Sequence, residues 1–254
     1  MLMKKTLAKK NLGQNFLISD LVIDQIIKYL SIEDNQNIIE IGPGRGAISF
    51  HIFNKTKNYF GIEKDHDMLK YLYPKIDEKN IILDDILKIN FSSLFEEKFK
   101  LVGNIPYNIS SKILEKIVDN REKFISVYLM IQKEVADRIV AQEGRKAYGR
   151  LSIFIQIFFE VEILFEIPPE CFSPKPKVVS SFIKLVPRKE ISYDIKDYES
   201  FSKFMKKIFN SRRKKIANNI NVPKKFSNPL LQERAEDLSI NKIVMLYNLI
   251  NNYG

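Results

Sequence analysis

Residues 37–46 read Asn37-Ile38-Ile39-Glu40-Ile41-Gly42-Pro43-Gly44-Arg45-Gly46. The first half is a short apolar run that predicts a buried strand, and three glycines alternate with other residues directly after it. An apolar pattern with helical spacing follows from Ala47 to Phe53. A strand, a glycine turn and a helix in this order are typical of an α/β fold with a mostly parallel sheet.

Three further strands are predicted downstream, and each runs into a polar residue. The strands are 59–62, 81–83 and 99–102, and the polar residues at their ends are Glu63, Asp85 and Asn104. Helix-length segments between them predict right-handed βαβ units. Because ligands of open α/β sheets bind outside the carboxyl ends of the strands, we expect a site at this edge.

The second half of the chain completes the predicted sheet and adds a small helical domain. Strands are expected at 124–131, within 151–167 and at 179–186, which gives seven, and helices at 20–30, 132–142, 201–220 and 240–250. The charged segment from Pro187 to Glu190 predicts a boundary. We therefore expect a catalytic α/β domain over residues 1–187 and an all-α domain over residues 188–254.

Composition narrows the class of protein. The chain has one cysteine and two histidines, which excludes an intramolecular disulfide framework and a cysteine-based zinc cluster and argues against any metal site. The basic start, Met1 to Lys10, has no apolar segment of signal-peptide length behind it, and no run approaches a membrane span. We expect a cytoplasmic protein.

Charge is concentrated at the two ends of the chain. The net charge is +10, with four lysines and no acidic residue in 1–14, and 14 basic against 7 acidic residues in 188–254. The middle is close to neutral. Basic ends on a neutral body predict a polyanionic partner, first of all nucleic acid, although solvated basic tails are the alternative.

The glycine turn favours a nucleoside without phosphates. It resembles the dinucleotide fingerprint, with Glu63 in the place of the ribose-binding acid. However, Pro43 removes an N–H where a pyrophosphate would be held, and the third glycine falls one residue early. S-adenosylmethionine fits better, with Glu63 on the ribose diol and Asp85 near the base. The alternative is that both carboxylates are only solvated strand ends.

The loop Gly103-Asn104-Ile105-Pro106-Tyr107-Asn108 predicts an adenine site. Pro106 stiffens it, because proline fixes its own φ and disfavours helical geometry in the residue before it. The amide of Asn104 and the carbonyl of Ile105 can accept hydrogen bonds from an exocyclic amine while Tyr107 stacks on the ring. Such bonds would aim the nitrogen lone pair at a methyl donor. Taken alone, the loop could be an ordinary Asn-Pro turn.

These motifs together resemble the bacterial KsgA/RsmA-type small-subunit ribosomal RNA adenine dimethyltransferases along the whole chain. The matching segments are 13–17, 40–44, 63–65, Asp85, 103–110, 132–135, 148–152, 172–180, 209–215 and 234–239. The resemblance implies a seven-stranded, Rossmann-like class I methyltransferase sheet with a small helical C-terminal domain. It also implies twofold methylation of N6 on two adjacent adenosines near the 3′ end of the small-subunit rRNA.

The resemblance assigns roles residue by residue. It implies that S-adenosylmethionine is contacted by Asn15, Leu17, Gly42, Gly44, Glu63, Asp85 and Asn104. It implies that Tyr107 and Phe172 sandwich the target adenine beside Ile105 and Pro106, although Phe172 could instead belong to the core. It implies a monomer that acts on the precursor of the small ribosomal subunit without a metal.

The basic residues are candidates for holding the RNA. They are Lys175 and Lys177 beside Phe172, and Lys206, Lys207, Arg212, Arg213 and Lys214 near the helix expected at 201–220. Two alternatives stay open: a related resistance methylase of large-subunit rRNA, and an RNA-binding assembly factor without catalysis. The departures from the family pattern are Arg45 in the glycine turn and a short C-terminal domain.

Overall fold

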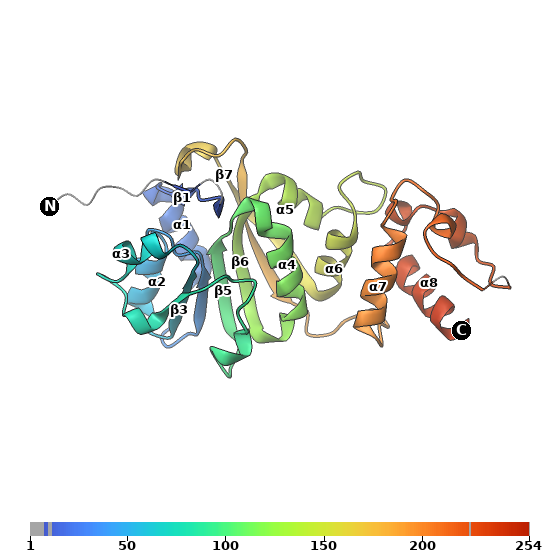
Figure 1. Ribbon diagram of the computed structural model, residues 1–254, viewed down its shortest axis with the longest axis horizontal. Coiled ribbons are helices and arrows are strands. Elements are labelled where there is room, and N and C mark those ends of the chain that lie inside the picture. The colour runs from blue at the N-terminus through green and yellow to red at the C-terminus, as the bar shows by residue number, and fades with distance from the viewer. Residues whose placement is uncertain (1–7, 10–11, 224, 254) are drawn as a thin grey trace. The chain divides into compact units, whose positions relative to one another are not determined.

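A seven-stranded sheet organises the chain (Figure 1), in a computed structural model that describes residues 8–9, 12–223 and 225–253. Its strand order is β4-β3-β2-β5-β6-β9-β7. The strands are β2 (Ile38–Ile41), β3 (Tyr59–Glu63), β4 (Ile81–Leu83), β5 (Phe99–Asn104), β6 (Phe124–Gln132), β7 (Phe159–Ile167) and β9 (Ser180–Pro187). The five neighbouring strands β4, β3, β2, β5 and β6 are parallel to one another, and β9 is antiparallel to β6. The predicted sheet is confirmed.

The register brings the polar strand ends to one level. Ile41 pairs with Ile62 of β3 and with Gly103 of β5. Glu63 and Asn104 therefore follow directly beside the start of the glycine turn. The pattern of four strands that end in polar or glycine residues thus becomes one continuous edge of the sheet.

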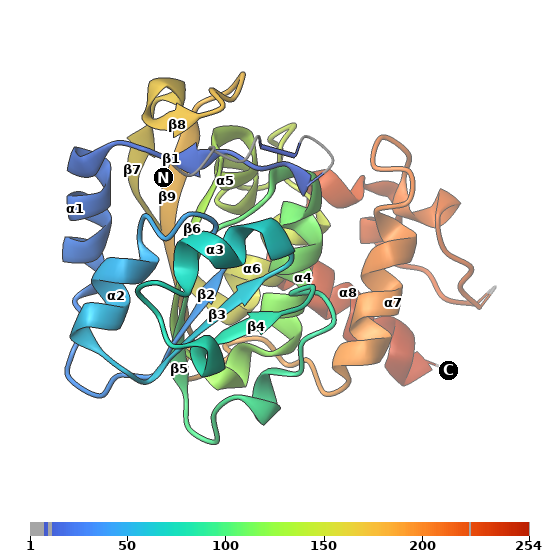
Figure 2. The same ribbon diagram turned by 60° about the vertical axis from the view of Figure 1, so that its left-hand side comes forward.

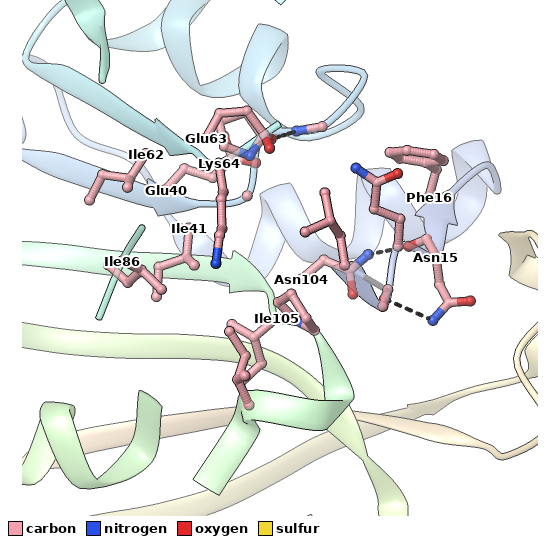
Figure 3. A pocket seen from close by; sticks show the side chains of 18 of the residues that line it. Asn15, Phe16, Glu40, Ile41, Ile62, Glu63, Lys64, Ile86, Asn104 and Ile105 are labelled. Atoms are coloured by element: carbon pink, nitrogen blue, oxygen red, sulfur yellow. Dashed lines mark hydrogen bonds between the residues drawn. The ribbon is translucent and has the colours of Figure 1, made fainter. Parts of the chain in front are cut away.

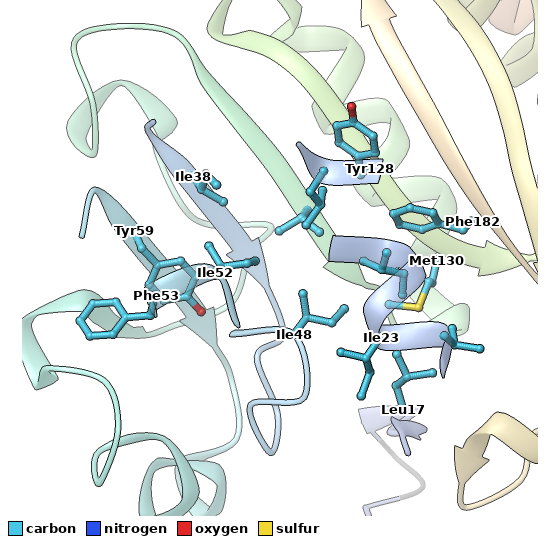
Figure 4. Packing of buried hydrophobic residues seen from close by; sticks show 14 of the residues in the cluster. Leu17, Ile23, Ile38, Ile48, Ile52, Phe53, Tyr59, Tyr128, Met130 and Phe182 are labelled. Atoms are coloured by element: carbon cyan, nitrogen blue, oxygen red, sulfur yellow. The ribbon is translucent and has the colours of Figure 1, made fainter. Parts of the chain in front are cut away.

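Eight α-helices lie within the part of the chain that the structure describes. They are α1 (Asp20–Leu30), α2 (Ser49–Lys55), α3 (Leu69–Leu72), α4 (Ser110–Asp119), α5 (Lys133–Ile139), α6 (Arg150–Phe158), α7 (Tyr198–Ile208) and α8 (Ile240–Tyr253). α1 and α2 lie side by side (Figure 2). Their apolar faces pack on the sheet, where Ile23 of α1 and Ile52 of α2 meet Ile38 and Met130 in one buried cluster (Figure 4).

A short second sheet was not predicted. β1 (Phe16–Leu17) pairs antiparallel with β8 (Phe172–Ser173), and Leu17 lies opposite Phe172. Runs of two residues are too short for a periodicity signal. This pairing ties the N-terminal segment to the rigid, proline-rich segment before β9.

The strand expected within 151–167 is only half a strand. Residues 150–158 form α6, and β7 begins at Phe159. Ser152 and Gln156 explain the helix, because they are four residues apart and both satisfy the end of α5. Ser152 Oγ donates to the carbonyl of Arg138 over 2.6 Å, and Gln156 Nε2 donates to the carbonyl of Ile139 over 2.9 Å.

The helix expected at 201–220 ends early. α7 stops at Ile208, and turns follow until a 3₁₀ helix begins at Ile216. Asn219 Nδ2 donates to the carbonyl of Ile208, which satisfies the helix end. The two charges that a continuous helix would have placed on its apolar side have partners: Arg212 bonds backbone carbonyls, and Lys215 Nζ donates to Gln232.

The chain forms two compact units. The first comprises residues 1–136 and 161–187, and the second comprises residues 137–160 and 188–254. The chain therefore passes from the first unit to the second after Pro187, where the boundary was expected. The second unit also contains residues 137–160, where the sequence pattern carried no boundary signal, and whether it folds as an independent domain stays a prediction.

Candidate functional site

A pocket lies at the carboxyl ends of β2, β3 and β5 in the first unit (Figure 3). Its walls come from residues 12–17, 40–45, 47–48, 62–64, 84–86 and 104–109. All but one of the residues that the sequence assigned to the cofactor and the target base line it: Asn15, Leu17, Gly42, Gly44, Glu63, Asp85, Asn104, Ile105, Pro106 and Tyr107. Phe172 is the exception.

Glu63 is fixed between the glycine turn and the segment that follows β3. Its Oε2 accepts from the N–H of Gly44 over 2.9 Å, and its Oε1 accepts from the N–H of Asp65 over 2.8 Å. The side chain is buried, and burial raises its pKa. Each carboxylate oxygen has a second lone pair, so Glu63 can still accept hydrogen bonds from a diol.

The glycine turn requires its glycines. Gly42 and Gly44 have φ of 66° and 59°, in the left-handed region. A Cβ on Gly44 would lie 3.1 Å from the ring of Phe16, whereas a Cβ on Gly42 would meet only the carbonyl of Asn104, at 3.8 Å. Arg45, the departure from the family pattern, places its guanidinium 4.3 Å from the centre of the Phe16 ring.

Asp85 is held as a carboxylate. Its Oδ2 accepts from Lys64 Nζ over 2.8 Å, and its Oδ1 accepts from the N–H of Leu87 over 3.0 Å. The hydrogen bond from Lys64 is the main reason that the pKa of Asp85 lies below its ordinary value. Asp85 is therefore an ionised acceptor at the rim of the pocket.

Asn104 has a defined orientation. Its Nδ2 donates to the backbone carbonyl of Asn15 over 2.7 Å (Figure 3). With the amide nitrogen engaged in this way, Oδ1 is the atom of the side chain that accepts. Ile105 is 1% exposed, and its N–H donates to the carbonyl of Met130 over 3.3 Å, which fixes the backbone of the loop.

Tyr107, in the same loop, has a half-buried side chain and lines the pocket. Its hydroxyl shares a 2.6 Å hydrogen bond with Ser180 Oγ, at the start of β9. Ser110 Oγ donates to the carbonyl of Tyr107 over 3.0 Å. Burial raises the pKa of the phenol, which therefore stays neutral. The ring is held at both its backbone and its hydroxyl.

Phe172 lies in the core instead of the pocket. Its side chain is 2% exposed and belongs to the cluster that contains Leu17, its partner across the short sheet. In this conformation the ring offers no face to a ligand. Nearby, Lys175 is paired with Glu170, and Lys177 is exposed.

Among the predicted basic residues of the second unit, Arg212 differs from the others. Its Nη1 donates to the carbonyls of Lys146 and Tyr148, both over 3.3 Å, so it has a structural task within this unit. Lys206, Lys207, Arg213 and Lys214 are exposed. These four side chains are accessible to a polyanion.

The sequence interpretation gave no role to Glu40, which also lines the pocket. It is 2% exposed, and its Oε2 accepts from the hydroxyl of Tyr59 over 2.7 Å. Burial, above all, raises its pKa to about 7. The available signal was an acid inside an apolar strand, one residue before the strand ends.

A family model described as ribosomal RNA adenine dimethylase matches residues 5–252. The chain belongs to the ribosomal RNA adenine dimethylase family. A relative named ribosomal RNA small subunit methyltransferase A, from Francisella tularensis subsp. novicida, is 38% identical over 262 residues, which cover 97% of this chain and 99% of the relative. The same protein from subsp. tularensis is 37% identical with the same coverage.

Solved structures agree with this family assignment. A dimethyladenosine transferase from Plasmodium falciparum is 25% identical, with a TM-score of 0.75 over 93% of this chain and 98% of that one. The 23S rRNA methyltransferase ErmE is 20% identical, with a TM-score of 0.66 over 93% and 100%. The likeness to ErmE supports the dimethylase fold alone.

Proposed function

We propose that this ribosomal RNA adenine dimethylase transfers methyl groups from S-adenosylmethionine to N6 of adenosines in small-subunit rRNA. The observation that carries the proposal is the oriented amide of Asn104, which lies in one pocket with Glu63 and Asp85. Relatives at 37–38% identity that are named for the small subunit support the choice of substrate.

The pocket fits a nucleoside cofactor with a charged sulfur. Glu63 would accept from the ribose hydroxyls and Asp85 from the adenine amine, because both present carboxylate oxygens to the pocket. The open space at Gly42, where a Cβ would meet only one atom within 4 Å, leaves room for the cofactor against the backbone. Asn15, Leu17 and Gly44 complete this half. When bound, S-adenosylmethionine supplies an electrophilic methyl group.

The target half is built to activate a poor nucleophile. The lone pair of an adenine amine is delocalised into the ring. Asn104 Oδ1 and the Ile105 carbonyl would accept the two amine hydrogens, which favours tetrahedral nitrogen and aims its lone pair at the methyl group. Asn104 and Ile105 would hold the nitrogen in this orientation while it accepts the methyl group. The methylated nitrogen would then release a proton, which has become acidic, to solvent water, so no strong base is needed.

Tyr107 would stack on the adenine after the base has left its helix. Pro106 keeps the loop extended, with ψ of 130° at the residue itself, so the ring and the acceptors stay in register. The sandwich between Tyr107 and Phe172 stays a prediction. It requires that the buried ring of Phe172 become exposed when the base arrives.

We infer that the enzyme acts on two adjacent adenosines near the 3′ end of the rRNA, in a precursor of the small subunit, as a monomer in the cytoplasm. Lys177 and the exposed cations Lys206, Lys207, Arg213 and Lys214 would contact phosphates. Among the described residues, no helix has the length and apolar character needed to span a membrane.

One assay separates the candidate activities. The chain is incubated with labelled S-adenosylmethionine and, in parallel, with unmethylated small subunits, large subunits and duplex DNA. Label in the small-subunit rRNA alone is the expected result. Label in large subunits would identify the resistance-type activity, and no label in any substrate would identify an assembly factor without catalysis. Either of these two results would overturn the proposal.

A further inference from the structure

The N-terminal segment is tied to two functional groups at once. We call residues 12–17, together with Lys9, the N-terminal strap. At one end of the strap, Lys9 and Gln14 bond to Asp65, two residues after Glu63. At the other end, the carbonyl of Asn15 bonds to Asn104. Lys4, Lys5 and Lys10, which contribute to the basic start of the sequence, lie outside the described residues.

Asp65 is the anchor of the strap. Its side chain is 2% exposed. Oδ1 accepts from Lys9 Nζ over 2.6 Å, and Oδ2 accepts from Gln14 Nε2 over 2.7 Å. The N–H of Lys9 donates in turn to Gln14 Oε1 over 2.8 Å. The two strap residues therefore bond each other and the same buried carboxylate.

This carboxylate is ionised. Burial alone would raise its pKa, but the hydrogen bonds from Lys9, Gln14 and the N–H of Asp67, together with the charge of Lys9, hold the pKa of Asp65 below its ordinary value. A buried charge of this kind costs several kcal/mol when its partners are removed. The anchor is therefore a strong constraint on Gln14.

The residue next to Gln14 holds the amide that faces the target base. The carbonyl of Asn15 accepts from Asn104 Nδ2 over 2.7 Å. On its other side, the strap is fixed by the pairing of Phe16 and Leu17 with β8, and by the Phe16 ring, which lies over Gly44. The position of the Asn15 carbonyl is therefore determined between two attachments.

We infer that Asp65 and Gln14 are positioning residues, which hold the Asn15 carbonyl in place and thereby keep Asn104 Oδ1 directed at the acceptor amine. The inference rests on the proposed function. It adds that the segment after β3 controls the aim of the target amine through the strap. The donor of the hydrogen bond from Asp65 to Glu63 Oε1 is the backbone N–H of Asp65, so side-chain changes at Asp65 leave this donor in place.

A charge-exchange cycle tests the pair. Gln14→Glu places two carboxylates against each other and should lower kcat by about tenfold or more, since small misplacements of a reacting group cost up to about 100-fold. KM for the small subunit should change by less than about threefold, within the usual context dependence of such contacts, because the exposed cations proposed to hold the RNA are unchanged. Asp65→Asn together with Gln14→Glu restores a donor and an acceptor and should recover most of kcat.

Asp67→Asn is the matched control. Asp67 Oδ2 also contacts Lys9 Nζ, over 2.8 Å, but its side chain is 48% exposed and does not touch Gln14. This variant should keep kcat close to that of the wild type. Unchanged kcat in Gln14→Glu, or no recovery in the double variant, would overturn the inference.

A second measurement does not depend on activity. In the ¹⁵N NMR spectrum of the free protein, the side-chain amide signal of Asn104, assigned from Asn104→Ala, should shift in Gln14→Glu and return in the double variant. A signal that does not move in Gln14→Glu would refute the positioning role even if the wild type methylated no rRNA. Failure of the proposed function alone would leave these shifts intact.

Discussion

Glu40 carries a pH dependence that its position in the strand explains. Burial favours the neutral acid and raises its pKa from 4.5 to about 7. The folded state therefore binds this proton more tightly than the unfolded chain, and stability falls as pH rises from 4.5 towards 7.

Glu40→Gln replaces the acid with a side chain that does not titrate. As pH rises across this window, we therefore expect the unfolding free energy of the wild type to fall by up to about 3 kcal/mol relative to that of the variant. Urea unfolding of both proteins without cofactor at several pH values measures the difference. A difference that stays constant from pH 4.5 to 7 would contradict the raised pKa.

Tyr107→Ala should weaken the binding of the target RNA, because stacking of a base on an aromatic ring contributes about 1–3 kcal/mol. Tyr107→Phe is the matched control. It keeps the ring and loses only the hydroxyl contact to Ser180. We expect the alanine variant to raise KM for small subunits by about tenfold or more and the phenylalanine variant to stay near the wild type. Equal losses in both variants would assign the role to the hydroxyl.

Single residues were predictable where their chemistry stands at a strand end. Glu63, Asp85 and Asn104 could be placed in one pocket because parallel strands end at the same edge. Gln14 and Asp65 could not, since 51 residues separate them and only the folded chain brings them together. For Phe172, the sequence motif suggested a ligand contact, whereas the structure buries the ring among apolar neighbours.

At the level of elements, strands were easier to predict than helix ends. The parallel strands β2 to β6 are largely apolar runs, and their positions follow from that pattern. The exception is β7, whose start could not be placed because α6 directly precedes it. The end of α7 depends on Asn219, whose amide bonds the carbonyl of Ile208 from 11 residues away. Such a contact has no local signature, so periodicity extended the helix too far.

α4 supports the loop that carries Asp85. Lys116 Nζ donates to the carbonyls of Leu87 and Ile89, over 3.2 and 2.7 Å. Lys116→Met leaves two carbonyls without this donor and should lower the unfolding free energy by about 1–3 kcal/mol. Because the loop that carries Asp85 would lose these two hydrogen bonds, the affinity for S-adenosylmethionine should fall as well.

Lys112→Met, at an exposed position of the same helix, is the control for this loop. Thermal unfolding and calorimetric titration with the cofactor provide the two measurements. If both methionine variants bind the cofactor as the wild type does, the loop does not depend on Lys116.

For the whole molecule, the uneven charge predicts where RNA is held. Replacing Lys206, Lys207, Arg213 and Lys214 with glutamine should weaken rRNA binding and reduce the slope of log K against log salt by about 3, since each lost phosphate contact contributes about 0.7–0.9. Lys28, Lys55, Lys79 and Lys98, which are exposed in the first unit, supply a control with the same change in charge.

The slope should change only in the first set. An equal reduction in both sets would show that binding responds to net charge, and no reduction in the first set would place the RNA contact elsewhere. Arg212 is left intact in this test because its guanidinium bonds the chain itself.

The central claim is that an oriented Asn104 directs methyl transfer to adenine N6. The direct measurement is mass spectrometry of nucleosides from small-subunit rRNA after incubation with S-adenosylmethionine and either the wild type or Asn104→Ala. The account predicts N6,N6-dimethyladenosine at two positions of the rRNA with the wild type and none with the variant, which should stay folded. Dimethyladenosine at normal levels with Asn104→Ala, or its absence with the wild type, would contradict the account.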